Sequence, residues 1–253
     1  MTGRRSFARY RLLVAGAATW TCLCGTAFGL EPEGRLLLAT GALPPLSASP
    51  GHPGFLDELA RAAFRRIGID VDVEALPPER AMINADEGID DGDIYRIAGI
   101  ERSFPNLVRV PEDVLDFEFT AYAKSPDIRI RTWDDLAPYA VAYTTGYRFY
   151  DLHVKAAREI TKTASIEELF PLLESGRADV ILVDRWQAQW IARREGYAVR
   201  RIEPALARTP MFMYLNRKHE ALVAGVARAL AEMKADGTYR KLYDTYLKPY
   251  DGP

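Results

Sequence analysis

An arginine and an aspartate close two stretches of the chain that share one pattern. Residues 87–96 (EGIDDGDIYR) and 175–184 (SGRADVILVD) each indicate the end of a helix, a glycine turn, an aspartate and a strand. When the stretches are aligned on Gly88 and Gly176, they end on Arg96 and Asp184. Because strand side chains alternate between two faces, residues at equal offsets are expected to project in matching directions. Open α/β sheets bind ligands at their strand ends, so this pair predicts a site for a small zwitterion.

Each candidate residue also has a purely structural interpretation. Helix–glycine–strand units are common in α/β proteins, and an arginine at a strand end often forms a surface ion pair. Asp184 could cap a helix that begins at Arg185, because aspartate is a favoured N-cap residue. Tyr122 could line a pocket or belong to the core. The sequence leaves both interpretations open.

The N-terminal residues predict export. Four arginines and no acidic residue precede an apolar run from residue 12 to residue 28, and residues 27–29 (AFG) form a small-x-small cleavage site. This order is that of a secretory signal peptide cleaved near Gly29, and the run is short for a membrane span. The arginine pair at residues 4–5 also resembles a twin-arginine signal, which leaves the export route open. We therefore expect a periplasmic protein that begins near residue 30.

The composition argues against several classes of site. Both cysteines lie inside the expected signal peptide, which leaves the exported chain without disulfides or cysteine-ligated zinc. The three histidines occur in separate elements without the spacing of a metal site. The formal net charge of −2 at pH 7 gives no basic footprint for nucleic acid. No nucleophile elbow or phosphate-binding glycine loop is present, so we expect a protein that is not an enzyme and has no cofactor and no metal.

Hydrophobic periodicity and turn residues predict alternating strands and helices. Strands are expected at residues 35–40, 69–74, around 94, 117–124, 140–143, 180–183 and 209–216, and helices at 55–67, 77–87, 147–159, 185–195 and 222–233. Capping boxes are expected at residues 132–135 and 165–168, and Pro171 should kink or shorten the helix after the second box.

Several of these segments together resemble a known family. The signal peptide, the LLATG segment followed by a Pro-Pro loop, the WDDL and SGRAD segments and the closing GTYRKLY occur in the order found in type 2 periplasmic solute-binding proteins. The amino-acid binders of this group serve ABC transporters. The resemblance extends from about residue 34 to residue 247 and implies an α/β fold of two Rossmann-like lobes joined by two crossover strands, as in a Venus flytrap.

The resemblance also implies a division of the chain. Residues 1–29 would be the signal peptide, residues 30–118 the first part of lobe 1, residues 119–208 lobe 2, and residues 209–253 the return to lobe 1. The crossover strands would be residues 117–124 and 209–216. A ligand would be held between the lobes, near these strands.

In the amino-acid binders, an aspartate that ends a second-lobe strand takes the ligand's ammonium group, and Asp184 matches that position. A turn in the same lobe takes the carboxylate through backbone N–H groups, and it corresponds to Thr144, Thr145 and Gly146. A first-lobe arginine usually follows a Thr-x-x-x-Arg pattern. This chain departs from that pattern, so Arg96, Arg102 and Arg80 compete for the role of carboxylate clamp.

The implied function is capture of a small carboxylate-bearing metabolite, an amino acid or a related compound, by a monomeric periplasmic protein for an ABC transporter permease. Two alternatives stay open. One is a periplasmic sensor or an accessory binding protein of an oxidation system, with a sensor or dehydrogenase as partner. The other is a dehydratase-like enzyme on the same fold, with Glu101 or Asp93 as the acid or base.

Overall fold

The computed structural model describes residues 35–41 and 44–251. The expected signal peptide therefore lies outside the described residues. Among the residues that are described, no helix combines the length and the apolar character needed to cross a bilayer.

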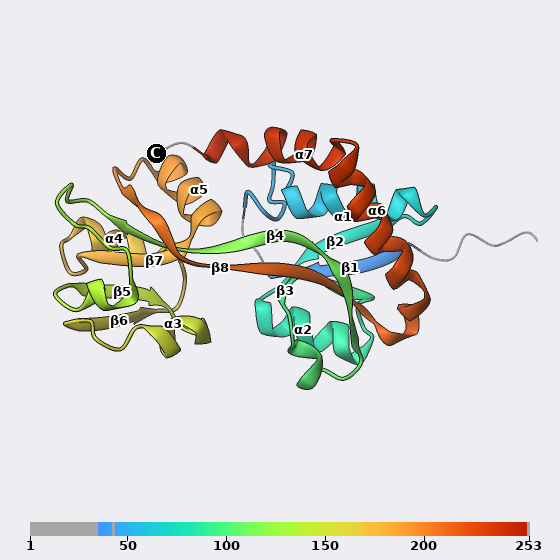
Figure 1. Cartoon of the computed structure of the whole chain (residues 1–253), viewed down its shortest axis with the longest axis horizontal. Helices are drawn as coiled ribbons and strands as arrows, with labels where there is room; N and C mark the ends of the chain where they lie inside the picture. Colours follow the sequence, from blue (N-terminus) through green and yellow to red (C-terminus); the bar gives the residue numbers. More distant parts are fainter. Residues whose placement is uncertain (1–34, 42–43, 252–253) are drawn as a thin grey trace, which may run out of the picture. The chain divides into compact units, whose positions relative to one another are not determined.

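One sheet of eight strands organises the protein, in the order β2-β1-β3-β8-β4-β7-β5-β6 (Figure 1). The strands are β1 (Leu36–Thr40), β2 (Val71–Ala75), β3 (Gly92–Ile97), β4 (Leu107–Ala123), β5 (Ala140–Thr144), β6 (Glu159–Thr163), β7 (Val180–Asp184) and β8 (Arg200–Asn216). Parallel pairing joins β1 to β2 and β3 at one end, and β5 to β6 and β7 at the other. The long strands β4 and β8 pair antiparallel between these two groups. The expected α/β fold of two lobes joined by two crossover strands is confirmed.

The helices are distributed between the same two groups. They are α1 (Phe55–Arg66), α2 (Pro78–Glu87), α3 (Arg148–His153), α4 (Leu169–Glu174), α5 (Arg185–Glu195), α6 (Val223–Ala235) and α7 (Thr238–Tyr246), with short 3-10 turns η1 (Ile100–Arg102), η2 (Trp133–Leu136), η3 (Arg217–Leu222) and η4 (Lys248–Tyr250). Helices α1, α6 and α7 pack against one another, although α1 lies far from the other two in the sequence (Figure 1). Helices α4 and α5 pack on β7.

The two similar stretches of sequence form the same local structure in both lobes. Asp91 donates its backbone N–H to the carbonyl of Leu37 at 2.7 Å and accepts the Leu37 N–H on its side chain at 2.8 Å. Asp179 makes the same pair of bonds with Ala140, both at 2.8 Å. Each aspartate thus fixes the start of one parallel strand against its neighbour. The repeated pattern is structural at these positions.

The repeat loses its regularity before it reaches Arg96. Strand β3 shifts register against β8 between Asp93 and Arg96, where three steps of β3 oppose two of β8. A bulge of this kind redirects the side chains that follow it. Strand β7 pairs with β4 and β5 without such a shift. Equal spacing from the two glycines therefore does not give Arg96 and Asp184 equal directions.

Two expectations about the second lobe are wrong. The helix expected at residues 147–159 ends at His153, and residues 159–163 form the edge strand β6, which pairs with β5. The tertiary partner decides this segment, because a short, mostly exposed sequence has no clear period of its own. The second capping box also fails: α4 begins at Leu169, and the Glu168 carboxylate instead accepts the Ala164 N–H at 3.1 Å. The first box, at Thr132 and Asp135, is confirmed.

The crossover strands are longer than expected, with 17 residues each. The lobe boundaries that we propose after residues 118 and 208 fall inside them, where Glu118 lies opposite Arg208 in the pairing register. The rings of Phe117 and Phe119 belong to the main core cluster, which also includes Leu38 of β1 and Leu182 of β7. Apolar contact is therefore continuous through the crossover strands.

Candidate functional site

Asp184 ends β7 and caps α5. Its Oδ1 accepts the backbone N–H groups of Trp186 at 3.0 Å and Gln187 at 3.2 Å. The side chain is 1% exposed, and its Oδ2 accepts no hydrogen bond from any described residue. The capping interpretation is therefore correct, yet it uses only one carboxylate oxygen. A buried oxygen without a donor is costly in a protein and suggests a missing partner.

The environment of Asp184 opposes its ionisation. Burial raises the pKa of the Asp184 carboxyl to about 7, although the hydrogen bonds from Gln187 and Trp186 act in the opposite direction. The negative charge of Glu118 raises this pKa further. Perturbed carboxyl groups of this kind occur frequently at functional sites.

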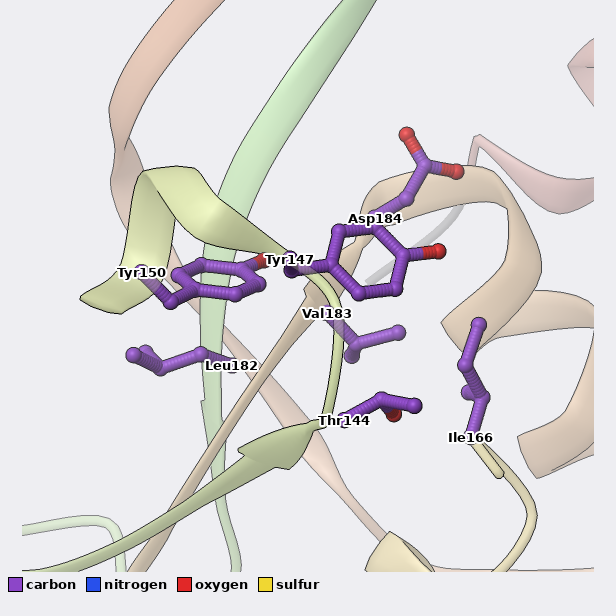
Figure 2. Close-up of a pocket in the computed structure, with 7 residues that line it drawn as sticks. All are labelled: Thr144, Tyr147, Tyr150, Ile166, Leu182, Val183 and Asp184. Atoms are coloured by element: carbon purple, nitrogen blue, oxygen red, sulfur yellow. The ribbon is translucent and has the colours of Figure 1, made fainter. Parts of the chain in front are cut away.

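A small pocket adjoins Asp184 (Figure 2). It is lined by Thr144, Tyr147, Tyr150, Ile166, Leu182, Val183 and Asp184, and it is too narrow for a water molecule. In Figure 2 the ring of Tyr147 is drawn between the carboxylate of Asp184 and Thr144, and the carboxylate points away from Thr144. The hydroxyls of Thr144 and Tyr150 are buried without a hydrogen-bond partner among the described residues. Tyr147 and Tyr150 thus occupy space that a ligand would need.

The turn after β5 has the backbone freedom expected of it. Gly146 has a φ of +92°, a conformation that side chains rarely adopt, and a Cβ added there would meet nothing within 4 Å. Thr144 is 8% exposed, whereas Thr145 is exposed and donates its N–H to the Thr163 carbonyl at 2.9 Å. The N–H of Thr145 is therefore already used in the pairing of β5 with β6. A carboxylate role for this turn stays a prediction.

Arg96 is held by neighbours in its own lobe. Its Nε and Nη2 donate to Oδ2 of Asp93 at 2.9 and 2.6 Å, and Nη2 also donates to the Pro78 carbonyl at 2.9 Å. Asp93 is fully buried, and burial raises its pKa while Arg96 lowers it. The structural interpretation of Arg96 is therefore realised. The hydrogen bonds of Arg96 with the described residues use Nε and Nη2, and Nη1 donates none of them.

Arg96 nevertheless lies close enough to the pocket to influence it electrostatically. Burial raises the pKa of Tyr147 to about 12, the charge of Asp184 raises it further, and the charge of Arg96 lowers it. The charges of both residues of the sequence-based pair therefore act on the pKa of the same tyrosine. Their roles as ligand clamps stay predictions.

The other predicted site residues are placed differently. The side chains of Arg80 and Arg102 are exposed and form no ion pair or hydrogen bond with the described residues. Tyr122 is fully buried in the second core cluster, where its hydroxyl donates to the Arg185 carbonyl at 3.2 Å. Tyr122 therefore lies behind α5 in the core and does not line the pocket.

Aromatic residues near Asp184 are the feature that sequence reasoning missed. The rings of Phe117 and Tyr147 have centroids 6.0 Å apart, and those of Tyr95 and Phe117 are 6.4 Å apart. Burial and the charge of Asp184 raise the pKa of Tyr95, whose buried hydroxyl has no partner among the described residues. The aromatic density of residues 147–150 (YRFY) was the signal that could have found Tyr147 and Tyr150.

Comparison with known proteins bears on the fold. No protein-family model matches the chain. An uncharacterized protein of Shewanella oneidensis is 23% identical over 192 residues, which cover 71% of this chain and 70% of that protein. An ancestral arginine-binding protein bound to arginine superposes with a TM-score of 0.70 at 23% identity and covers 85% of this chain and 99% of its own. This chain has the type 2 periplasmic solute-binding fold.

Two further solved structures share this fold. The substrate-binding protein of an amino acid ABC transporter has a TM-score of 0.66 at 19% identity and covers 85% of this chain and 100% of its own. The ancestral amino acid-binding protein AncCDT-1, a precursor of cyclohexadienyl dehydratase, has a TM-score of 0.67 at 22% identity and covers 85% of this chain and 95% of its own. These relatives are binding proteins, and one of them is described as the precursor of an enzyme.

Because Arg96 pairs with the buried Asp93, its substitution should lower the free energy of unfolding even without ligand. An arginine that served only to bind a ligand would not have this effect. Arg96→Ala leaves the Asp93 carboxylate buried without its partner, which typically costs about 3–5 kcal/mol. Arg35→Ala is the matched control, because the Arg35–Asp72 pair is exposed and should contribute at most about 1 kcal/mol. Urea unfolding of the ligand-free variants measures both. Equal, small losses would show that Arg96 is not needed by Asp93.

The pKa of Asp184 predicts a pH dependence of stability. The carboxyl titrates at about 7 in the folded protein, against a reference value of 3.8, so the folded state holds its proton more tightly between these values. The free energy of unfolding should therefore fall as pH rises from about 4 to about 7. Asp184→Asn cannot ionise, and its urea-unfolding profile should lack this component. Parallel profiles for the two proteins would contradict the raised pKa.

Proposed function

We propose that this protein is a periplasmic solute-binding protein that captures a small metabolite between its two lobes for an ABC-type uptake system. The metabolite carries an amine and a carboxylate, as an amino acid or a related compound does. The observation that carries the proposal is the half-satisfied, buried carboxylate of Asp184 at the end of a second-lobe strand. Ligands of open α/β folds bind at such strand ends.

In this proposal, Oδ2 of Asp184 accepts a hydrogen bond from the ligand's ammonium group while Oδ1 continues to cap α5. The carboxylate of the ligand lies near the turn at residues 144–146 or near Nη1 of Arg96, with Arg102 and Arg80 as the other candidates for the arginine clamp. Tyr147 and Tyr150 must move to admit the ligand, because the pocket beside them has no room for water. Ligand binding and rearrangement of the site are therefore coupled.

The same proposal includes export and assembly. The N-terminal 29 residues act as a signal peptide, and the exported protein is a monomer in the periplasm that delivers its ligand to a permease. The resemblance in fold to amino-acid-binding proteins supports this reading over an enzymatic one. The two carboxyl groups that the sequence analysis considered for a dehydratase, Asp93 and Glu101, both have partners within the protein. Asp93 is engaged by Arg96, and Glu101 accepts a hydrogen bond from Tyr214 at 2.9 Å with its pKa lowered by its backbone and by Tyr214.

The proposed role of Asp184 predicts a large loss of affinity on substitution. A thermal-shift screen of amino acids would first identify a ligand, and calorimetry would then compare variants. Asp184→Asn should weaken binding at least ~30-fold, because loss of one partner of a desolvated charge pair typically costs about 2–5 kcal/mol. Small-angle scattering should show a smaller radius of gyration with ligand, as expected for hinge closure.

Asp179→Asn serves as the control, because Asp179 lies at the start of the same strand and bonds to Ala140. Its affinity for the ligand should equal that of the parent protein. Normal binding by Asp184→Asn would show that the ligand presents no ammonium group to this carboxylate. Unchanged scattering at saturation would contradict capture by closure.

A further inference from the structure

The charged groups around Asp184 are paired with one another and leave its carboxyl group without a cationic partner among the described residues. The charge of Arg96 is balanced by Asp93, whose Oδ2 lies 2.6 Å from its Nη2. The charge of Glu118 is matched by Arg185 at 3.2 Å and by Arg208 at 3.4 Å. No cationic group of the described residues forms an ion pair with Asp184 itself.

Two aromatic residues, Tyr147 and Tyr150, line the same pocket as Asp184. Burial raises the pKa of Tyr95, Tyr147 and Tyr150, and the charge of Asp184 raises each of these pKa values further. Phe117 lies between Tyr95 and Tyr147, about 6 Å from each ring centroid. The exposed Asp116 adds a second negative charge that acts on Tyr95. Aromatic faces and a desolvated carboxylate both attract cations, and neither attracts an anion.

We propose that the site recognises an organic cation, held by Asp184 and the rings of Tyr95, Phe117 and Tyr147, and that a carboxylate on the ligand is dispensable. This inference rests on the proposed solute-binding function and narrows its ligand class. A carboxylate of the ligand would meet the guanidinium of Arg96, whose charge Asp93 already balances. An ammonium or guanidinium group of the ligand would instead form an ion pair with Asp184, which has no cationic partner among the described residues. The site therefore discriminates among ligands mainly by their positive group.

Matched ligands test this inference. Calorimetry and thermal shift would compare lysine with cadaverine, which lacks the carboxylate, and with hexanoate, which lacks the amines. Phenylalanine, phenethylamine and 3-phenylpropionate form a second set, and choline is a cation with no N–H donor. At least one cation without a carboxylate should bind within about tenfold of the best amino acid, a difference of about 1.4 kcal/mol. The two plain acids should not bind.

Variants of Tyr147 distinguish the contribution of its aromatic ring to binding from that of its hydroxyl group. Tyr147→Leu should weaken cation binding at least ~5-fold, in the range of a desolvated cation–π contact, whereas Tyr147→Phe keeps the aromatic face and should bind as the parent does. Binding of an acid in preference to its matched amine, or binding of none of the cations, would overturn the inference. If an acid or an uncharged compound binds and compacts the protein in scattering, solute capture stands and only the ligand class is wrong. Failure of every ligand to compact the protein contradicts the proposed function itself.

A separate set of contacts involves the C-terminal residues. The segment 248–251, which comprises η4 and Asp251, follows α7 in the chain, and η4 contacts both α7 and α5. The Asp251 carboxylate pairs with Arg185 and accepts a hydrogen bond from the Tyr243 hydroxyl at 3.5 Å. At the other end of α5, Arg193 donates to the Pro249 carbonyl, and its guanidinium lies 5.6 Å from the ring centroid of Tyr250.

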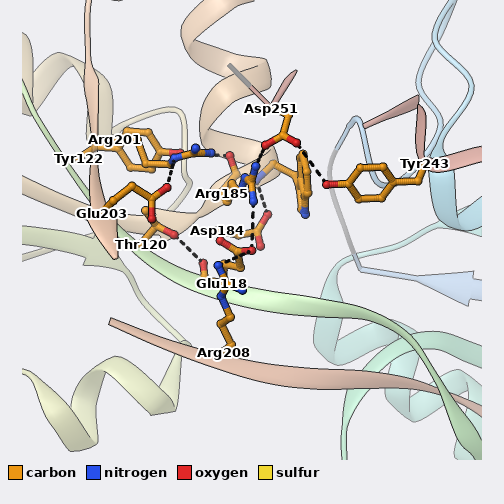
Figure 3. A network of polar contacts seen from close by, with 11 residues as sticks. Glu118, Thr120, Tyr122, Asp184, Arg185, Arg201, Glu203, Arg208, Tyr243 and Asp251 are labelled. Carbon is orange, nitrogen blue, oxygen red and sulfur yellow. Dashed lines mark hydrogen bonds and ion pairs between the residues drawn. The ribbon is translucent and has the colours of Figure 1, made fainter. Parts of the chain in front are cut away.

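This segment connects the two lobes outside the crossover strands. Tyr250 packs against both the main core cluster and the second core cluster. Trp186 of α5 and Tyr243 of α7 meet edge to face beside it, with centroids 5.6 Å apart. Arg185 continues the contact to Glu118 of β4, which also pairs with Arg208 of β8 (Figure 3). A chain of charges thus runs from the C-terminal segment to both crossover strands, directly beside Asp184.

Independently of the ligand class, we infer that residues 248–251 act as a strap that fixes α5 relative to α7 and restricts the relative motion of the lobes. Asp184 is the N-cap of helix α5, so the strap also positions the ligand-binding carboxylate. A contact that is made in one arrangement of the lobes and lost in another shifts the equilibrium between them.

Spin labels test the strap. The chain from residue 30 onward contains no cysteine, so Ile83→Cys on α2 and Leu152→Cys on α3 place two labels at exposed positions, one in each lobe. The distribution of distances between the labels should broaden in Asp251→Asn and broaden further when residues 248–253 are deleted. Arg194→Ala is the control, because Arg194 lies on α5 but contacts Glu195 and Trp190. Its distribution should match that of the parent.

If the deletion variant fails to fold, Asp251→Asn still tests the strap. Circular dichroism shows whether each of the two variants is folded. Hydrogen exchange in α5 should also be faster in Asp251→Asn than in the control. Unchanged distance distributions and unchanged exchange would overturn the strap. Broadening in the Arg194→Ala control would overturn it as well, because the effect would then belong to α5 in general.

Discussion

Strands β4 and β8 pair from Leu107 opposite Asn216 to Ala123 opposite Arg200, and each lobe is attached to one side of this ladder. Strand β3 joins β8, and strand β7 joins β4. Side chains alternate along a strand, so neighbouring residues of β4 serve different purposes. Phe117 and Phe119 enter the apolar core, while Glu118 between them pairs with arginines of α5 and β8. The apolar and the charged connections between the lobes therefore start from three consecutive residues.

The pairing of buried charges is the basis on which we propose what the site binds. A buried carboxylate must be neutralised, paired or hydrogen-bonded, since each uncompensated charge is strongly unfavourable. Asp93 is paired with Arg96, and Glu118 with two arginines. Asp184 accepts the N–H groups at the start of α5 and forms no ion pair, and its Oδ2 has no hydrogen-bond donor among the described residues. This difference, rather than the mere presence of acids near the lobes, is the reason why we propose Asp184 as the centre of the site.

Much of the fold could be predicted from the sequence. The sequence predicts the periodic helix at α1 and the apolar strand β7 with nearly correct ends. It also indicates that Asp184 is either a helix cap or a ligand-binding residue. The edge strand β6 was missed, because its identity depends on pairing with β5. Arg96 was expected to mirror Asp184, but a bulge in β3 breaks the spacing on which that expectation depended. Tyr147 was not recognised, because its importance comes from its place beside Asp184.

The sequence by itself determined the features that depend on a few neighbouring residues. These include most of the strands and helices, and the cap of α5 by Asp184. Only the tertiary structure decided which charges are neutralised and which aromatic rings share the site. Glu118 meets Arg185 across 67 positions of the chain, and Trp186 meets Tyr243 across the two lobes. Burial and charge pairing are sums over such distant neighbours, and no local pattern in the sequence encodes them.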